Sequence, residues 1–145
     1  MEFIRNTFGV FLGLAVAGCI ISLGLRIDPS WTHCTNIAPF EHWEKVLASE
    51  EHKPGFFWLL LACSGLGTTI GGVVTAVVVK YAKVAYAILI GFIMLFIAMV
   101  DIVIFPYHPT FYKILIFIIY FPFSWVGGKI VEVIFDRKKK QHIVK

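Results

Sequence analysis

A few charged side chains interrupt segments that are otherwise strongly apolar. Asp101 lies near the end of one such segment, and Lys113 comes shortly after it, beyond the turn PYHPT. Lys129 and Glu132 lie three residues apart, which lets them pair along one face of a helix. Ionisable groups inside a bilayer are costly, so each marks either an ion pair or a relay for protons or ions. We expect an ion pair between Asp101 and Lys113, with a relay as the alternative.

The cysteines and histidines form no recognisable metal-binding or catalytic pattern. Four of them share one polar stretch, namely His33, Cys34, His42 and His52. Their spacing matches no zinc pattern. Cys19 and Cys63 lie in apolar segments, where cysteine acts as a small hydrophobe. Because the sequence also lacks a recognisable pair of nucleophile and base, we expect no enzymatic activity, no cofactor and no bound metal.

The glycine-rich stretch SGLGTTIGG, residues 64–72, raises the question of a nucleotide-binding loop. A dinucleotide fingerprint requires a preceding strand and a βαβ unit of about 30 residues. Here the glycines lie in the middle of an uncharged apolar run, residues 55–79, which leaves no room for such a unit. In a helix, the small residues of this run form one flat face, made of Ser64, Gly67, Thr68, Gly71, Gly72 and Thr75.

A similar row of small residues lies in the first apolar segment, at Gly9, Gly13 and Ala17. Helices in lipid associate through close packing and hydrogen bonds, because lipid and a partner helix are equally apolar. Flat faces of small residues allow that close approach. The simplest prediction is that the first apolar helix packs on the second. The same faces would also suit a seam between two copies of the chain, and the sequence leaves both arrangements open.

These residues belong to a chain with the composition of a membrane protein. Of its 145 residues, 59% are hydrophobic and 15% are charged, and its mean hydropathy is +0.83. Four apolar segments stand out, at about 7–25, 56–79, 84–105 and 111–135. Each is close to the roughly 20 residues that a spanning helix needs, and backbone groups in lipid must be paired within a helix. We expect an all-α integral membrane four-helix bundle, formed by residues 1–145 as a single transmembrane domain.

Basic residues predict how the bundle is oriented. One side collects Arg5, Lys80, Lys83 and the basic tail 136–145, and the longer loop 26–55 falls on the other side. Lysine and arginine gather on the cytoplasmic side of membrane proteins, so both termini should be cytoplasmic. Because the net charge of +4 is concentrated next to the apolar segments, it favours membrane topology over nucleic-acid binding.

The outer loop 26–55 contains a second, shorter helical pattern. Pro39 suits the first turn of a helix. Phe40, Trp43 and Leu47 follow at helical spacing, with charged residues between them. We predict a short interfacial helix on the outer surface, with Trp43 at the depth of the lipid headgroups. A docking surface for a partner protein is the alternative.

The last apolar segment carries two further irregularities. Pro122 lacks a backbone donor and crowds the preceding turn, and the pair Gly127 and Gly128 follows it. Interruptions of this kind can mark a transport site. They can also be points where helices pack closely, and this is the interpretation that we favour.

Three motifs carry a resemblance to a known family, namely LGTTIGG in the second apolar segment, PYHP in the last turn and FPFSWVGGK in the last segment. The stretch from about Lys53 to Glu132 resembles a family of uncharacterised small bacterial inner-membrane proteins. The resemblance covers a little over half of the chain. It implies a four-helix fold in a bacterial inner membrane and no catalytic residues.

The sequence therefore indicates a structural, interaction or accessory subunit of a membrane. Its expected partners are the lipid bilayer and either a second copy of the chain or another membrane protein. The alternative is a small transporter or channel. Its working residues would be Asp101, Lys129 and Glu132, with breaks in the last helix at Pro122 and Gly127.

Overall fold

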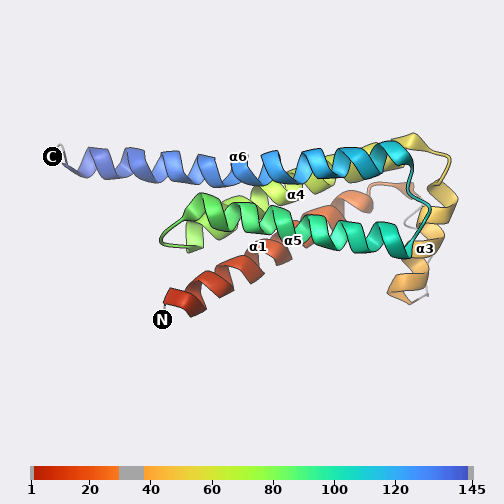
Figure 1. The fold of residues 1–145 in the computed structure, drawn as a ribbon, viewed down its shortest axis with the longest axis horizontal. Helices are drawn as coiled ribbons and strands as arrows, with labels where there is room; N and C mark the ends of the chain where they lie inside the picture. The colour runs from red at the N-terminus through yellow and green to blue at the C-terminus, as the bar shows by residue number, and fades with distance from the viewer. Residues whose placement is uncertain (1, 30–37, 144–145) are drawn as a thin grey trace.

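The computed structural model describes residues 2–29 and 38–143, and this part of the chain is helical without any strand (Figure 1). The helices are α1 (Glu2–Leu25), α3 (Pro39–Glu50), α4 (Pro54–Val78), α5 (Lys83–Ile104) and α6 (Thr110–Ile143). Four of them, α1, α4, α5 and α6, are long and apolar enough to cross a membrane. The all-α fold and the four candidate spans are therefore confirmed.

Two helix boundaries differ from the prediction. The first helix already begins at Glu2, not near residue 7, and the last continues to Ile143, not to residue 135. The described part of the basic tail is thus a helical extension of the last span. Charged residues outside the apolar segment continue a helix readily, and hydropathy alone therefore places the ends too early.

Figure 1 shows the four long helices running side by side, with both termini at one end of the bundle. The shorter α3 crosses the opposite end. We call the part of the bundle toward the termini the terminal half, and the part toward α3 the α3 half. The end of α6 extends well past the other helices, beyond the terminal half.

In the terminal half, the backbones of α1 and α4 touch. A Cβ atom added to Gly71 would lie 2.6 Å from the carbonyl oxygen of Gly13, and one added to Gly13 would lie 2.7 Å from that of Gly71. The hydroxyl of Thr75 donates a hydrogen bond of 3.0 Å to the carbonyl of Gly9. Only residues without bulky side chains permit this approach, which is the packing that helices in lipid use.

The same close packing joins α6 to α4 and α5. A Cβ atom on Gly127 would collide with the carbonyl of Thr69 on α4, and one on Gly128 would lie 2.7 Å from the Cβ of Ala87 on α5. The hydroxyl of Thr69 also donates to the carbonyl of Phe123, at 3.2 Å. The glycine pair therefore lies between two neighbouring helices.

The breaks at Pro122 and Gly127 on which the transporter alternative relied do not occur, because α6 is one continuous helix through both positions. Proline is tolerated inside a spanning helix when neighbouring groups satisfy the backbone that it disturbs. Pro122 takes the donor from the carbonyl of Ile118, and close packing at Gly127 and Gly128 holds α4 and α5 against the same part of α6. The irregular sequence of α6 thus serves packing in this structure.

The turn KYAK between α4 and α5 is tight. Ala82 has φ 51° and ψ 40°, in the left-handed region that L-residues rarely occupy. The ammonium of Lys83 donates to the carbonyls of Ala76 and Val79, at 2.8 Å and 2.6 Å. A cation at the C-terminus of α4 satisfies its last carbonyls and complements its dipole.

The predicted short helix is present as α3, beginning at Pro39. It docks on the bundle through Val46 and Leu47, which are fully buried, whereas Phe40 is 75% exposed. At its end Lys53 forms an ion pair of 2.7 Å with Glu50, and this hydrogen bond raises the pKa of the Lys53 ammonium. α3 is therefore packed against the bundle along its C-terminal part.

Candidate functional site

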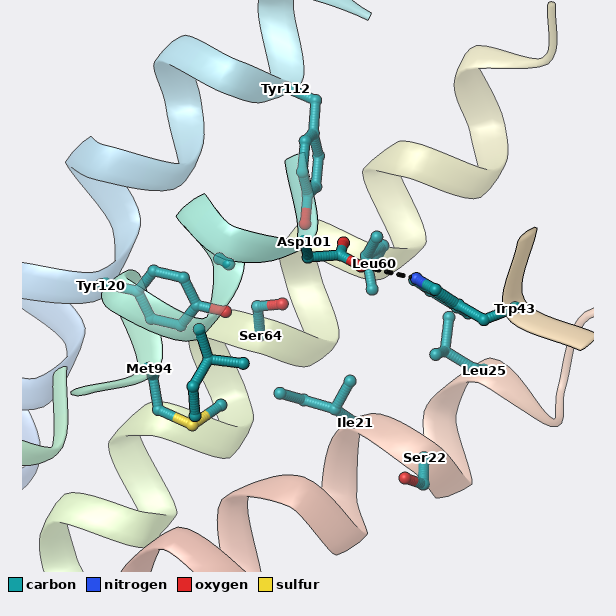
Figure 2. Close-up of a pocket in the computed structure, with 12 residues that line it drawn as sticks. Ile21, Ser22, Leu25, Trp43, Leu60, Ser64, Met94, Asp101, Tyr112 and Tyr120 are labelled. Atoms are coloured by element: carbon teal, nitrogen blue, oxygen red, sulfur yellow. Dashed lines mark hydrogen bonds between the residues drawn. The ribbon is translucent and has the colours of Figure 1, made fainter. Parts of the chain in front are cut away.

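The most distinctive polar contact of the α3 half joins α3 to α5. The indole Nε1 of Trp43 donates a hydrogen bond of 2.7 Å to Oδ1 of Asp101 (Figure 2). The Asp101 side chain is 23% exposed, so this carboxylate is largely removed from solvent. A hydrogen bond to a charged acceptor is among the stronger ones in proteins, and it holds α3 over the end of the bundle.

The second partner of Asp101 is His108, in the turn between α5 and α6. The His108 residue is 3% exposed. Its Nδ1 lies 2.9 Å from the carbonyl oxygen of Phe105, and because a carbonyl only accepts, Nδ1 carries a hydrogen. Its Nε2 lies 3.1 Å from Oδ2 of Asp101, although the two are not aligned as a regular hydrogen bond.

The expected ion pair between Asp101 and Lys113 is absent from the described residues, and Asp101 pairs with Trp43 and His108 instead. The reason is the rotation of α6. Successive helical residues point about 100° apart, and Tyr112, only 3% exposed, is the one that faces the bundle. Lys113 is thereby turned away from Asp101.

A cavity of about 310 Å³ lies beneath α3 and receives side chains from all five helices. Its walls are mostly apolar and include Ile21, Leu25, Leu60, Met94 and Ala98. Asp101 is the acidic residue that lines it. Two lining residues are themselves exposed, Ser22 on α1 and Ile97 on α5. The mouth therefore lies between α1 and α5, which contact each other less than the other adjacent helices do.

Three hydroxyl groups add polarity to this cavity. Figure 2 shows the hydroxyl of Tyr112 directed toward Asp101, and the hydroxyl of Tyr120 directed toward Ser64. All three residues are at most 3% exposed. Buried hydroxyls of this kind orient a ligand by donating or accepting hydrogen bonds.

An aromatic cluster supports the wall behind Asp101. Phe57 is fully buried, and its ring lies 5.8 Å from that of His108 and 5.6 Å from that of Tyr112. The His108 ring also stacks on Tyr112, with centroids 5.1 Å apart. Trp43 in turn lies 6.4 Å from Phe56. Packed rings restrict rotamers, so the polar groups keep their positions.

The other charges that we singled out lie away from this cavity. Lys129 and Glu132 form an ion pair with side chains 50% and 40% exposed. Glu132 also borders a hollow of about 280 Å³ at the opposite end of the bundle, beside Lys80 and Asp136. The structure therefore does not bring Asp101, Lys129 and Glu132 to one site, as the transporter interpretation required.

The small residues lie at helix contacts within the chain. Gly9, Gly13 and Ala17 of α1 are buried against α4, where the row is made of Gly67, Gly71 and Thr75. The second row of α4 faces α5 and α6, with Gly72 near Ser124 and Ala87. Thr68 is buried, and its hydroxyl donates to the carbonyl of Ser64.

Within the described residues, no group of three or more histidine, cysteine, aspartate or glutamate side chains is placed to hold a metal ion. His33 and Cys34 lie outside those residues. No family model, curated protein or solved structure matches the chain, so its resemblance to a bacterial family stays a prediction.

Sequence reasoning missed the convergence of Trp43, His108, Tyr112 and Tyr120 around Asp101. A signal was present in the spacing of Tyr112 and Tyr120, eight residues apart, which places two polar-tipped rings near one face of a helix. Tyrosine hydroxyls inside an apolar span call for partners, as the buried carboxylate does. Reading these groups together would have indicated a polar pocket.

Proposed function

We propose that this chain is a non-enzymatic accessory protein of the membrane that holds a small amphipathic molecule in its α3-half cavity. The observation that carries the proposal is the cavity itself, with about 310 Å³ of space, apolar walls and a single carboxylate. Ligand pockets commonly have volumes of about 300–1,000 Å³, apolar walls and few polar groups.

The position of the mouth supports entry from the lipid. Ser22 and Ile97 lie within helices that are apolar enough to span, so the opening between α1 and α5 faces the bilayer in a four-span arrangement. An amphipathic molecule dissolved in the membrane would reach the cavity sideways. α3, held by Trp43, would cover the cavity from the aqueous side.

The rival functions have less support. A channel or carrier needs a path through the terminal half, where Gly13 and Gly71 bring two backbones into contact. A homo-oligomer based on the small-residue faces would need surfaces that the chain already uses internally. For an enzyme, Ser64 would need a base, and His108 is not among the residues that line the cavity with it.

We also propose the orientation that the basic residues favour. Arg5, Lys80 and residues 137–140 are exposed and belong to the terminal half or to the extension beyond it. The positive-inside rule then places both termini in the cytoplasm, in keeping with a bacterial inner membrane. The cavity would lie toward the extracytoplasmic surface, with lipid and another membrane protein as the remaining partners.

The test uses the full chain in lipid nanodiscs and three probes with the same phenethyl body, namely phenethylammonium, phenethyl alcohol and 3-phenylpropionate. We expect at least one probe to raise the unfolding temperature of the protein by several degrees, because a ligand stabilises the state that it binds. Ala98→Phe places a ring in the cavity and should abolish this shift.

Ala62→Phe is the matched control, since Ala62 is exposed on α4 and the same volume is added outside the cavity. It should keep the shift. If no probe shifts the unfolding temperature, or if Ala98→Phe responds like the wild-type chain, the cavity is not a binding site.

A further inference from the structure

We propose that the ligand of the α3-half cavity is a single-chain lipid whose small head donates hydrogen bonds and carries no phosphate, and that its chain leaves the cavity between α1 and α5 and lies in the bilayer. The proposal rests on the proposed function, because it requires the cavity to be a binding site. It adds the chemical class of the ligand and the place of its chain.

The mouth of the cavity opens on the hydrocarbon layer. The 22 residues of α5 measure about 33 Å, close to the roughly 30 Å of that layer. Ile97, the exposed lining residue of α5, lies about 10 Å below the end of this helix at Ile104. Ser22 lies about 5 Å below the end of α1 at Leu25. An opening at that depth meets the acyl chains of the lipid and not its headgroups.

The carboxylate is within reach of a short head that enters through this mouth. Asp101 comes four residues after Ile97, which is about 6 Å further along α5 toward α3. The volume of about 310 Å³ is at the lower end of the range for ligand pockets. The cavity therefore has room for a head and the first part of one chain, whereas a phospholipid with two acyl chains is too large for it.

The lining determines which head fits. Asp101 is the only charged lining residue within the described part of the chain, and no lysine or arginine of that part lines the cavity. A phosphate would place a second negative charge beside the carboxylate in a largely apolar space, which is strongly disfavoured. A hydroxyl or an ammonium group instead donates to oxygens, and the lining offers those of Asp101, Ser64, Tyr112 and Tyr120.

This selectivity separates the ligand from the surrounding lipid. Phospholipids surround the mouth in great excess, so a cavity that accepted any acyl chain would be filled by them. The size of the cavity excludes their two chains, and the lack of a lining cation excludes their phosphate. A single-chain alcohol or amine meets neither obstacle.

Residues next to the mouth mark the path of the chain outside the cavity. Cys19 comes three residues before Ser22, and Ile93 comes four residues before Ile97. Residues at these spacings are neighbours on one side of a helix, so both lie below the mouth, toward the terminal half. Because α1 and α5 contact each other less than the other adjacent helices do, a chain has room to lie along them there.

The test is photolabelling of the full chain in phosphatidylglycerol nanodiscs with two dodecanol probes. One probe carries a diazirine next to the hydroxyl, and the other carries it at the far end of the chain. Mass spectrometry should find the first on residues inside the cavity, such as Leu60 and Met94, and the second on Cys19 and Ile93. Excess unlabelled dodecanol should remove this labelling, because it competes for a saturable site and not for the bulk lipid.

A pair of variants tests the mouth. Ser22→Phe places a ring in the opening and should lower the saturable labelling by about tenfold, as expected when a ligand meets an overpacked site. Ala62→Phe is the matched control, because Ala62 is exposed on α4, and its labelling should equal that of the wild-type chain. If Ser22→Phe fails to fold by circular dichroism, the positions labelled by the two probes in the wild-type chain decide the matter.

Competitors of the same chain length, compared at equal concentration in the bilayer, identify the head. Dodecyl phosphate should compete about tenfold more weakly than dodecanol, because its charge is uncompensated in the cavity. Dodecylammonium distinguishes the two permitted heads. Stronger competition than that of dodecanol assigns an ammonium head to the ligand, and equal or weaker competition assigns a hydroxyl.

The outcomes that overturn the inference differ from those that overturn the proposed function. Labelling of Leu60 and Met94 by the far-end diazirine would place the chain inside the cavity and refute its path. Equal competition by dodecyl phosphate would refute the selection of the head. Absence of saturable labelling would refute the inference alone if the phenethyl probes still shift the unfolding temperature, and would refute the binding site as well if they do not.

Discussion

The two halves of the bundle are built from the same four helices but packed in opposite ways. In the terminal half, Gly13 and Gly71 bring backbones into contact, and Gly127 does the same for α6. In the α3 half, large side chains such as Tyr112 and Tyr120 separate the helices and leave a cavity beneath α3. The comparison teaches that the size of the side chains along a helix decides where a bundle is closed and where it is open.

The largest effect should come from adding one methyl group to the closed half. Gly71→Ala places a Cβ atom 2.6 Å from the carbonyl oxygen of Gly13, and neither backbone can move away without separating α1 from α4. We expect a loss of about 2–3 kcal/mol in the free energy of unfolding, typical of overpacking. Unfolding in mixed micelles measures it.

Gly18→Ala is its matched control, because a Cβ atom on Gly18 would meet no atom within 4 Å. That variant should be at least as stable as the wild-type chain, because alanine favours a helix more than glycine does. Equal stability of the two variants would show that the closed half is not held by backbone contact.

The next largest effect should be confined to the open half. Asp101→Ala removes the acceptor of the Trp43 indole N–H and the carboxylate that lies 3.1 Å from His108 Nε2. We expect a loss of about 2 kcal/mol, the order found when a buried polar group loses its partner. Hydrogen exchange should quicken in α3 and in the turn 105–109 while the terminal half stays protected.

Asp136→Ala serves as control, since Asp136 is exposed on the extension of α6. Faster exchange throughout the chain in Asp101→Ala would mean that the two halves unfold together, and the distinction between them would lose its energetic meaning.

A smaller effect tests the attachment of α3 alone. Trp43→Phe keeps an aromatic ring near Phe56 but loses the hydrogen bond to Asp101. We expect about 1 kcal/mol of destabilisation, seen as faster exchange within α3. Trp58→Phe is the control, because Trp58 is 57% exposed and stacks on Phe111. An equal response from both variants would argue that ring size, not the hydrogen bond, secures α3.

The smallest effect concerns the hydrogen bond across the closed half. Thr75→Val removes the donor to the carbonyl of Gly9 without changing the shape of the side chain. Interhelical hydrogen bonds in membranes contribute about 0.6 kcal/mol on average, and the same unfolding measurement should show a loss of that size. Thr68→Val loses only a bond within α4 and should cost less. A larger loss of stability in Thr68→Val than in Thr75→Val would contradict the prediction that the bond between helices contributes more than the bond within α4.

The sequence predicted the four candidate spans because hydropathy is a local property. The faces of small residues were also readable, since a spacing of four keeps Gly67, Gly71 and Thr75 on one side of a helix. The structure places this row against α1. The terminal half thus follows from patterns that each helix carries by itself.

The α3 half could not be read in the same way, because it depends on how separate helices are rotated. The partner of Asp101 is set by the turn PYHPT, which presents Tyr112 to the bundle and turns Lys113 away. The approach of Trp43 depends on where α3 lies over the end of the bundle, and nothing in the spacing of α3 reveals it. A cavity is a property of several helices at once, so single-helix patterns do not predict it.

The extension of α6 has an electrostatic consequence. The helix has 34 residues and α5 has 22, a difference of 12 residues that amounts to about 18 Å at 1.5 Å per residue. The ammonium nitrogen of Lys83, at the start of α5, lies 4.1 Å from the centre of the Phe135 ring, and this contact marks where α6 extends beyond α5. The exposed Arg137 and Lys138 to Lys140 follow it. At physiological ionic strength, dissolved ions screen charge over about 8 Å. The far lysines of this rod are therefore electrically separate from its base and would attract an anionic group independently of the bundle.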